Sequence, residues 1–479
     1  MMNEFDRFKT PFEERYSSKE MLYLFSPNKK FTTWRKLWIA LAESEKELGL
    51  NITQEQINEM KSHIEDIDFE YAKEMEKKFR HDVMAHVHTF GKVCPSAMPI
   101  IHLGATSAFV GDNTDIIVMK EALELVRSKL VAVLENLKTF ALKYKDLPAL
   151  GFTHFQPAQL TTVGKRAALW MQDFMLDLEN LVFEHSNIRF RGVKGTTGTQ
   201  ASFLHLFNND HEKVRQLDKL VSSKMGFEKV FGVSGQTYTR KQDSRIIAVL
   251  AGFAESAHKF ATDIRLLANL KEVEEPFEKN QIGSSAMAYK RNPMRSERVC
   301  ALSRFIIAAS SNTYYTHSVQ WFERTLDDSA NRRLSISETF LAADAVLELL
   351  LNITSGLVVY EKVIAKRISE ELPFMATENI IMESVQHGAD RQEMHEQIRI
   401  HSMEAGKRIK QDGLDNDLLK RVIADDKIPL NEKDIERILN PKEFIGRAPE
   451  QTVEFIENEI DPLISRYKTN KNFEGIVNV

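Results

Sequence analysis

The chain has little cysteine and no long apolar run. Its two cysteines, Cys94 and Cys300, lie far apart and form neither a Cys-x-x-Cys pair nor a zinc-ligand spacing. This excludes a disulfide framework and is typical of a reduced, cytosolic protein. The longest apolar stretch, residues 349–360, is well short of the ~20 residues that cross a bilayer, and the charged N-terminal residues do not resemble a signal peptide. We therefore expect a cytoplasmic protein with no membrane partner.

The chain also lacks an excess of charge of either sign. Lys and Arg together number 64 and Asp and Glu 69, which gives a net charge of −5 over 479 residues. Without a global positive field, neither nucleic acid nor an anionic membrane is expected as a partner. Any anion-binding site must therefore be local.

Proline is absent from two long stretches, residues 158–275 and 294–372. Helices much longer than the average of about 11–12 residues fit there. Apolar residues recur at alternating intervals of three and four over 123–140 and 246–267, which predicts helices packed lengthwise on near-parallel neighbours. One short bundle does not cover the apolar stripes of such helices, so we expect the chain to associate with copies of itself. A monomeric, spectrin-like rod is the alternative, and the specialised loops argue against it.

The helical and proline patterns divide the chain into three regions. Short helices interrupted by prolines fill residues 1–106, long helices fill 107–359, and shorter, more charged helices fill 360–479. We predict an all-α fold of three helical domains with these boundaries. The central bundle is expected to carry the active site and the oligomerisation surface.

A polar turn at residues 104–115 precedes the first long helix. Asn113, Thr114 and Asp115 are residue types that cap helix N-termini. We expect them to satisfy the first free N–H groups of that helix.

The loop at residues 283–298 has the clearest chemical pattern. It reads Gly-Ser-Ser-Ala-Met-Ala-Tyr-Lys-Arg-Asn-Pro-Met-Arg-Ser-Glu-Arg and lies between two long helical patterns. Gly283 permits unusual backbone angles, and the small residues after it leave peptide N–H groups open to a ligand. Four cationic side chains face a single carboxylate, Glu297. The composition fits an anion-binding loop, and equally a solvated basic turn.

Two further polar segments are candidates for an anionic substrate. Residues 152–164 place His154 among threonines and glutamines, too many polar groups for an apolar core. Residues 321–333 combine Arg324, Ser329 and Arg333, which suits bidentate capture of a phosphate, with an intrahelical charge ladder as the alternative.

Two other segments fit less specific interpretations. Residues 192–200, rich in glycine and threonine, predict either a backbone cradle for an anion or a helix-to-helix turn, and match neither a Walker A loop nor a dinucleotide fold. His81, His86 and His88 lack Cys, Asp or Glu partners at ligand spacing, so we expect polar or substrate-contacting histidines and no metal.

The 283–298 loop closely resembles the signature loop of the fumarase/aspartase superfamily, whose members eliminate fumarate from a succinyl group. Within it, the sequence is most similar to the animal-type adenylosuccinate lyase family. Ala288 stands where that family usually has proline, which implies a less rigid loop. The resemblance covers nearly the whole chain. It implies a three-domain all-α fold, a homotetrameric core of long central helices, and active sites that each draw residues from three subunits.

The resemblance also implies catalytic roles. His154 matches the general acid that protonates the departing nitrogen, and Ser284 matches the base that removes the proton from the succinyl carbon. The pattern alone does not choose between Ser284 and its neighbour Ser285. His81 matches a residue that assists substrate binding near the acid, and Lys290 one that stabilises the carbanion.

The remaining matches are substrate contacts in the family. They are Lys290, Asn292, Thr153 and Gln236 for the succinyl carboxylates, Arg15, Tyr16, Arg324, Ser329 and Arg333 for the nucleotide phosphate, and Arg80, Asp82, Thr106, Ser107 and Arg298 for further nucleotide or succinyl contacts.

The implied reaction is fumarate release from succinylated purine nucleotides, without a metal or redox cofactor. The carbanion places charge on a carboxylate, which pre-placed cations and N–H donors must stabilise. Serine is a poor base unless the same water-excluded loop stabilises its alkoxide, so loop closure belongs to the expected mechanism. The alternatives are another fumarate-releasing lyase such as argininosuccinate lyase or fumarase, which the phosphate-type arginines disfavour, and a catalytically silent scaffold of the same fold.

Overall fold

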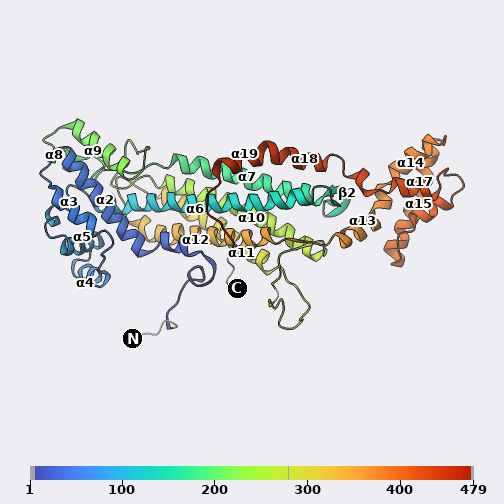
Figure 1. Ribbon diagram of the computed structural model, residues 1–479, viewed down its shortest axis with the longest axis horizontal. Coiled ribbons are helices and arrows are strands. Elements are labelled where there is room, and N and C mark those ends of the chain that lie inside the picture. The colour runs from blue at the N-terminus through green and yellow to red at the C-terminus, as the bar shows by residue number, and fades with distance from the viewer. Residues whose placement is uncertain (1–5, 279, 476–479) are drawn as a thin grey trace.

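Long helices running side by side along the longest axis form the body of the molecule (Figure 1). The computed structural model describes residues 6–278 and 280–475. Within them, strands are limited to two antiparallel pairs of short segments. The predicted all-α class is confirmed. No helix of the described residues is long and apolar enough to span a bilayer.

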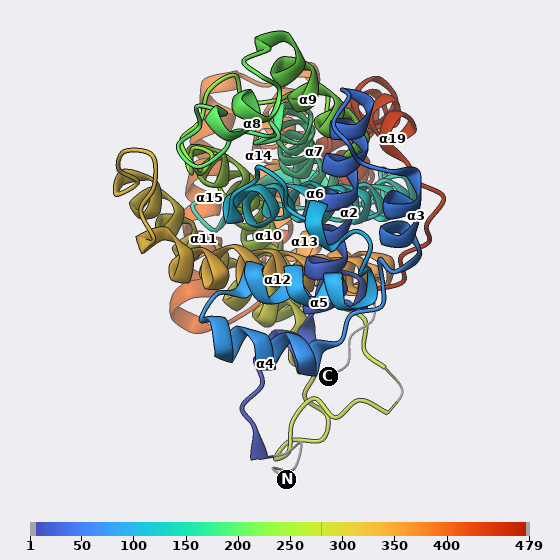
Figure 2. The same cartoon turned by 90° about the vertical axis from the view of Figure 1, so that its left-hand side faces the viewer.

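Short helices form one end of the molecule. Figure 2 shows α2 to α5 grouped at this end, while the chain from residue 6 to residue 11 projects from the body. The elements are η2 (Phe12–Tyr16), α1 (Lys19–Leu24), α2 (Pro27–Glu47), α3 (Gln54–Ser62), α4 (Phe69–Phe79), α5 (Asp82–Val93) and η3 (Met98–Ile100).

The central helices supply most of the hydrophobic core. Both stretches with alternating three- and four-residue spacing are helical, and the apolar residues that define them are buried, so that prediction is confirmed. The elements are α6 (Ser107–Lys143), β1 (Pro148–Thr153), β2 (Gln156–Thr162), α7 (Val163–Asn187), α8 (Ala201–Leu206), α9 (His211–Lys224), α10 (Lys241–Asn269), β3 (Val273–Glu274), α11 (Met294–Ser318), α12 (Asp327–Ser355) and β4 (Val358–Val359).

The C-terminal helices divide between two cores. A second hydrophobic cluster lies within residues 376–438, whereas α18 and α19 return alongside α7 and α6 (Figure 1). The elements are α13 (Glu361–Met375), α14 (Thr377–Gln386), α15 (Arg391–Asp412), α16 (Leu418–Ala424), α17 (Glu432–Ile438), η4 (Pro441–Phe444), α18 (Ala448–Phe455), η5 (Ile456–Ile460) and α19 (Asp461–Tyr467). The boundaries drawn from the sequence at 106/107 and 359/360 stay predictions.

The start of α6 differs from the sequence-based expectation. The helix begins at Ser107, with the extended Thr106 as N-cap residue, so Asn113 and Asp115 lie inside it and do not cap it. Their side chains have tertiary partners instead. Asn113 exchanges two 3.1 Å hydrogen bonds with the backbone of Gly192, and Asp115 accepts one of 2.8 Å from Arg332. Residue types that usually cap helices therefore make tertiary contacts here, inside the helix.

Glu45 carries a buried carboxyl group to which no described residue donates a hydrogen bond. It lies on α2, which packs against α3, α6 and α9, and its exposed fraction is 0%. Neither carboxylate oxygen has a hydrogen-bond partner among the described residues. Burial raises the pKa of Glu45 to about 9, so the native protein holds this group neutral at pH 7.

The Glu45→Gln variant is expected to be more stable than the wild type, by an amount that grows with pH. Because the folded-state pKa lies above the unfolded-state value, the stability linked to Glu45 is complete below about pH 4.5 and is lost as pH rises toward 9. Glutamine does not titrate, so its advantage reaches at most about 3 kcal/mol at pH 7. Thermal melting of both proteins between pH 5 and 8 measures this. The exposed Glu47→Gln serves as control, and a pH-independent difference contradicts the assignment.

Candidate active site

A cleft of about 710 Å³ lies where the N-terminal helices meet the first turns of α6 and α12. It gathers predicted site residues from distant parts of the sequence, and Figure 2 shows α5 and α12 near one another at this end. The predicted residues that line it are Arg80, His81, Asp82, Ser107, Arg324, Ser329 and Arg333. One chain thus brings the first histidine and the predicted phosphate-binding residues into a single cavity.

His81 is held by the start of α5. Arg80 adopts a left-handed conformation at the end of α4, with φ of 56°, and turns the chain so that His81 becomes the N-cap of α5. The His81 Nδ1 accepts a 3.3 Å hydrogen bond from the Met84 N–H, so the hydrogen of the neutral ring is on Nε2. That nitrogen lies 3.4 Å from Ser107 Oγ. The imidazole therefore presents a donor to the hydroxyl at the start of α6.

Arg324 and Arg333 flank Ser329 in the turn before α12 and in its first two turns. Both arginines are exposed and form no ion pair within the described residues. The alternative of an intrahelical charge ladder is not observed, because Asp328 pairs with Arg240 at 2.6 Å. Two uncommitted guanidinium groups beside a hydroxyl suit a phosphate.

Gln236 lies next to this turn. Its N–H donates to the Glu323 carbonyl at 2.8 Å, and its carbonyl accepts a 2.7 Å hydrogen bond from Arg191 Nε. The Gln236 backbone therefore fixes the segment that leads into Arg324.

His154 lies at the tip of the β1–β2 hairpin, which the sequence did not predict. His154 and Phe155 form a two-residue turn with φ of 53° and 57°, the geometry of a type I′ turn. Without Asn or Gly at either position, this backbone is strained, as is common at functional sites. Thr153 and His154 are both exposed. The hairpin therefore presents the predicted acid to its surroundings.

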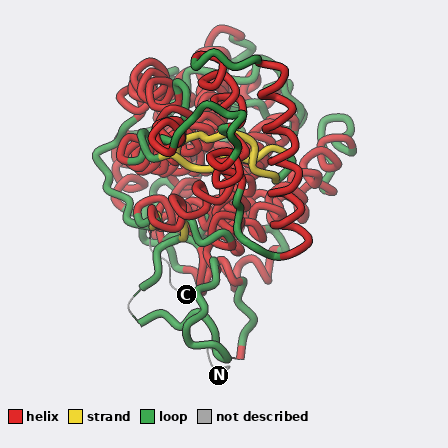
Figure 3. Tube along the Cα trace, turned by 90° about the vertical axis from the view of Figure 1, so that its right-hand side faces the viewer, coloured by secondary structure: helices red, strands yellow, loops and turns green. Residues whose placement is uncertain are grey.

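The hairpin and the cleft are far apart within one chain. Figure 3 shows the strands, in yellow, seen from the end opposite that of Figure 2. The hairpin follows the end of α6, whereas Ser107 begins it, and α6 has 37 residues. At 1.5 Å per residue its ends are about 55 Å apart. His154 and His81 of the same chain therefore do not share a site.

The 283–298 loop folds back on itself and singles out Ser284. The Ser284 Oγ accepts hydrogen bonds from the N–H groups of Ala286 at 3.3 Å and Met287 at 3.1 Å, which favour negative charge on that oxygen. Asn292 closes the loop with a 2.8 Å hydrogen bond to the Gly283 carbonyl. A Cβ at position 283 would collide with the Lys290 carbonyl. Glycine is therefore required there.

The N-terminal turn η2 lies against the helix that follows this loop. The Arg298 guanidinium is 5.2 Å from the centre of the Tyr16 ring, and Phe12 contacts Phe305 of α11 with 5.6 Å between ring centres. Arg15 and Tyr16 thus belong with the loop residues. The predicted site residues fall into three groups: the cleft, the hairpin, and the loop with η2. Thr106 and Gln236 do not line the cleft but adjoin it, next to Ser107 and to the Arg324 turn.

Three basic residues that line the cleft were not predicted from the sequence, namely Lys30, Arg240 and Arg332. Arg240 follows the polar turn at 235–238, and Arg332 adjoins the predicted Arg333. No local pattern distinguishes Arg240 or Arg332 from an ordinary arginine on a helix surface, because the carboxylates that they pair with are distant in the sequence.

The other candidate segments hold no ligand-binding geometry of their own. In the 192–200 loop, the carbonyls of Gly192 and Gly195 accept hydrogen bonds from Arg191, at 3.1 Å each. Carbonyls instead of N–H groups converge there, which favours the turn interpretation. His86 stacks on Phe31 with 3.6 Å between ring centres, and burial lowers its pKa to about 4.

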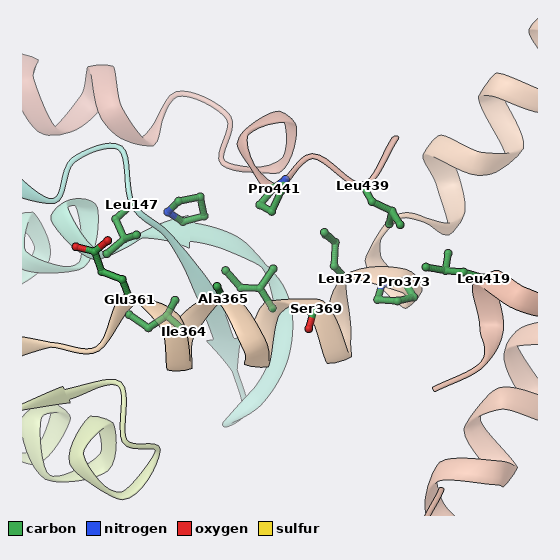
Figure 4. A pocket seen from close by; sticks show the side chains of 12 residues that line it. Leu147, Glu361, Ile364, Ala365, Ser369, Leu372, Pro373, Leu419, Leu439 and Pro441 are labelled. Carbon is green, nitrogen blue, oxygen red and sulfur yellow. The ribbon is translucent and has the colours of Figure 1, made fainter. Parts of the chain in front are cut away.

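Two features in the C-terminal part lie away from these groups. Glu383, His387 and Asp434 have ligand atoms within 4.8 Å of one another, but Arg437 already lies against both carboxylates. A second, mainly apolar cavity of about 320 Å³ is lined by residues of α13 and neighbouring segments (Figure 4). No predicted site residue lines it.

Comparison with known proteins identifies the family. Residues 28–307 match the family model described as Lyase, and residues 373–455 match that described as Adenylosuccinate lyase C-terminus. The chain is 55% identical to the adenylosuccinate lyase of Saccharomyces cerevisiae, over 99% of each chain. It is 54% identical to that of Schizosaccharomyces pombe and 50% identical to that of Schistosoma mansoni, over 98% of each chain in both cases.

Solved structures support the fold independently. The 3-carboxy-cis,cis-muconate lactonizing enzyme from Pseudomonas putida superimposes with a TM-score of 0.81 at 20% identity, over 95% of this chain and 99% of that chain. A fumarate lyase from Mesorhizobium sp. BNC1 gives 0.77 at 19% identity, over 96% and 99%. Such identities establish architecture alone. Together with the full-length matches above, they show that the chain is a lyase and belongs to the adenylosuccinate lyase family, of the eukaryotic type, within the fumarase/aspartase superfamily.

Proposed function

We propose that the chain performs its family's reaction through the three groups of residues described above. The reaction is β-elimination of fumarate from adenylosuccinate, leaving AMP, and from succinylaminoimidazole carboxamide ribotide (SAICAR), leaving the free carboxamide ribotide (AICAR), in purine nucleotide biosynthesis. The observation that carries the proposal is the cleft. In it Arg324 and Arg333, which form no ion pair within the described residues, flank Ser329 close to His81 and Ser107.

The cleft fits the nucleotide. Arg324, Arg333 and Ser329 supply charged and hydroxyl donors to the phosphate, with Arg15 and Tyr16 added from another subunit. Arg80, Asp82, Thr106, Ser107 and Arg298 contact the remainder of the substrate in this proposal. His81 donates through Nε2, because its Nδ1 is engaged by the helix N-terminus.

The chemical step uses the loop and the hairpin. Ser284, as alkoxide, removes the proton from the succinyl carbon, and the N–H groups of Ala286 and Met287 stabilise that oxygen beforehand. The electron pair of the broken C–H bond forms the carbon–carbon double bond as the C–N bond breaks. His154 protonates the leaving nitrogen. Lys290, Asn292, Thr153 and Gln236 hold the succinyl carboxylates.

We propose that several subunits build each site and that the protein is a homotetramer. The hairpin and the cleft are about 55 Å apart in one chain, by the length of α6, which supports a site completed by neighbouring copies. The long helices also expose apolar side chains. Leu169, Leu176 and Phe183 recur every seven residues on α7, and Tyr314 and Tyr315 protrude from α11. A lengthwise partner helix would cover them.

The proposed reaction needs neither metal nor redox cofactor, because proton transfers and anion stabilisation suffice. A cytoplasmic location and no nucleic-acid or membrane partner complete the proposal. Full-length identity to adenylosuccinate lyases does not favour argininosuccinate lyase, fumarase or a silent scaffold.

The Ser284→Ala and His154→Asn variants are expected to lose at least about a hundredfold in kcat for fumarate release, because each removes a proton-transfer group. Asparagine tolerates the left-handed backbone at position 154, so the turn is retained. Fumarate release from adenylosuccinate and the oligomeric mass are measured together.

Ser285→Ala is the matched control, because no described N–H group donates to the Ser285 hydroxyl. It is expected to retain most activity. Near-normal turnover of a folded Ser284→Ala variant would contradict the assignment of the base, and loss of turnover in Ser285→Ala alone would move the assignment to that residue.

Mixing the two inactive variants tests whether the sites are shared. If His154 and Ser284 of one site come from different subunits, random tetramers of the two variants hold both groups intact in about a quarter of the sites. Co-expression should therefore restore roughly that fraction of wild-type activity. A co-assembled, folded mixture with no more activity than its parents would show that one subunit supplies both groups.

A further inference from the structure

Arg240 lies at the centre of a buried ion network in the floor of the cleft. Its side chain is 2% exposed. The Nε donates to Asp328 Oδ2 at 2.6 Å and Nη2 donates to Asp112 Oδ1 at 3.1 Å. Its backbone N–H donates to Gln320 Oε1 at 2.8 Å. One residue therefore joins three segments that are separate in the sequence.

Each of these segments carries a residue of the cleft. Asp328 lies in the first turn of α12 and immediately precedes Ser329. Asp112 lies on α6 between its start at Ser107 and the middle of the helix. Gln320 leads into the turn that holds Arg324. A shift of Arg240 would move these elements relative to one another.

Gln320 extends the connection back toward Gln236. Its Nε2 donates to the Tyr238 carbonyl at 2.9 Å and lies 3.3 Å from Thr237 Oγ1. The Tyr238 N–H in turn donates to Asp112 Oδ2 at 3.0 Å. The segment that carries Gln236 and the segment that carries Arg324 are therefore tied to each other and to α6.

Arg240 and Arg332 are each paired with buried carboxylates, although the Arg240 Nη1 has no hydrogen-bond partner among the described residues. Burial alone would raise the pKa of Asp112, but the guanidinium groups of Arg240, Arg332 and Arg191 hold it below its ordinary value. Arg332 adds a second connection, from α12 to Asp243 at 2.8 Å and to the Tyr238 hydroxyl at 2.7 Å. A buried ion network is weak evidence for stability, since apolar residues often serve as well. It does fix the relative position of the elements it joins.

We propose that Arg240 is a positioning residue for the nucleotide phosphate, which holds the Arg324 turn and the first turns of α12 against α6. The inference rests on the proposed function and deepens it at the phosphate end of the site. Arg240 acts through Ser329, Arg324 and Arg333. Lysine does not reproduce this arrangement, because its compact ammonium group lacks the rigid planar fork by which the Arg240 Nε and Nη2 reach carboxylates on two helices.

The Arg240→Lys variant tests the proposal, with AMP and adenosine as probes that differ only in the phosphate. We expect the dissociation constant for AMP and the KM for adenylosuccinate to rise by about tenfold or more, the scale of a lost hydrogen bond to a charged group. Adenosine affinity should stay within about twofold and kcat within about threefold. If Arg240 had a merely structural role, the substitution would lower the affinities for AMP and adenosine alike.

The matched control is Arg245→Lys, the same substitution in the first turns of α10 at a half-exposed arginine that pairs with the buried Glu184 away from the cleft residues. Arg245→Lys should change the affinity for neither AMP nor adenosine. Melting temperature and oligomeric mass are recorded for every variant. If Arg240→Lys does not fold, Gln320→Ala is the second test. It removes the connection to the Arg324 turn without leaving a buried charge unpaired. It should lower the affinity for AMP and leave the affinity for adenosine unchanged.

Equal loss of AMP and adenosine affinity, or no loss of AMP affinity, in a folded variant overturns the proposal. The same holds if wild-type AMP and adenosine affinities do not differ. Failure of the proposed function would be recognised differently, by a wild-type protein that binds AMP but releases no fumarate. In that case the effect of Arg240→Lys on AMP and adenosine affinity would still test the role of Arg240.

Discussion

The length of α6 is the constraint on which the rest of the structure depends. Its 37 residues form one uninterrupted helix that packs against α7 and α12, with buried apolar residues along most of its length. A straight helix of this length holds its ends about 55 Å apart. Polar groups at Ser107 and at the β1–β2 hairpin are thus fixed at separate places. A rigid core here determines which residues of one chain can meet.

Buried polar groups mark where that core is anchored to its surroundings. Lys129 of α6 pairs with Asp344 and Glu348 of α12, and Asp344 also accepts a 2.6 Å hydrogen bond from the Ser18 N–H. The N-terminal turn with Arg15 and Tyr16 is thereby joined to the bundle. At the end near Ser107, Arg240 and Arg332 make the equivalent connections. Ion pairs secure the segments that carry the candidate site residues, while apolar contacts hold the helices together.

The sequence allowed much of this arrangement to be predicted, for physical reasons that differ between elements. Apolar spacing is a local property, so the long helices at 123–140 and 246–267 were identifiable from it. The start of α6 was not, because Asn113 and Asp115 have the chemistry of caps but are held by Gly192 and Arg332 far along the chain.

The contacts within the candidate site were the least predictable part. Arg240 pairs with residues 88 and 128 positions away, and no local pattern encodes such a pairing. The hairpin was hidden for another reason. Its turn uses His154 and Phe155 at positive φ where Asn-Gly would have indicated it. The resemblance identified His154 as a candidate, and only the fold shows how its backbone is held.

The loop at 283–298 carries Ser284, the proposed base, and contains no histidine. Ala288 does not fix φ as proline would, so the order of the loop depends on its own hydrogen bonds. These run from Asn292 to the Gly283 carbonyl and from the Lys290 N–H to the Met287 carbonyl, at 2.8 and 3.0 Å. The same fold directs two N–H groups at Ser284 Oγ. In the proposed mechanism, the order of the loop and the stabilisation of the Ser284 alkoxide therefore have one origin, so a change that loosens the loop is expected to weaken the proposed base as well.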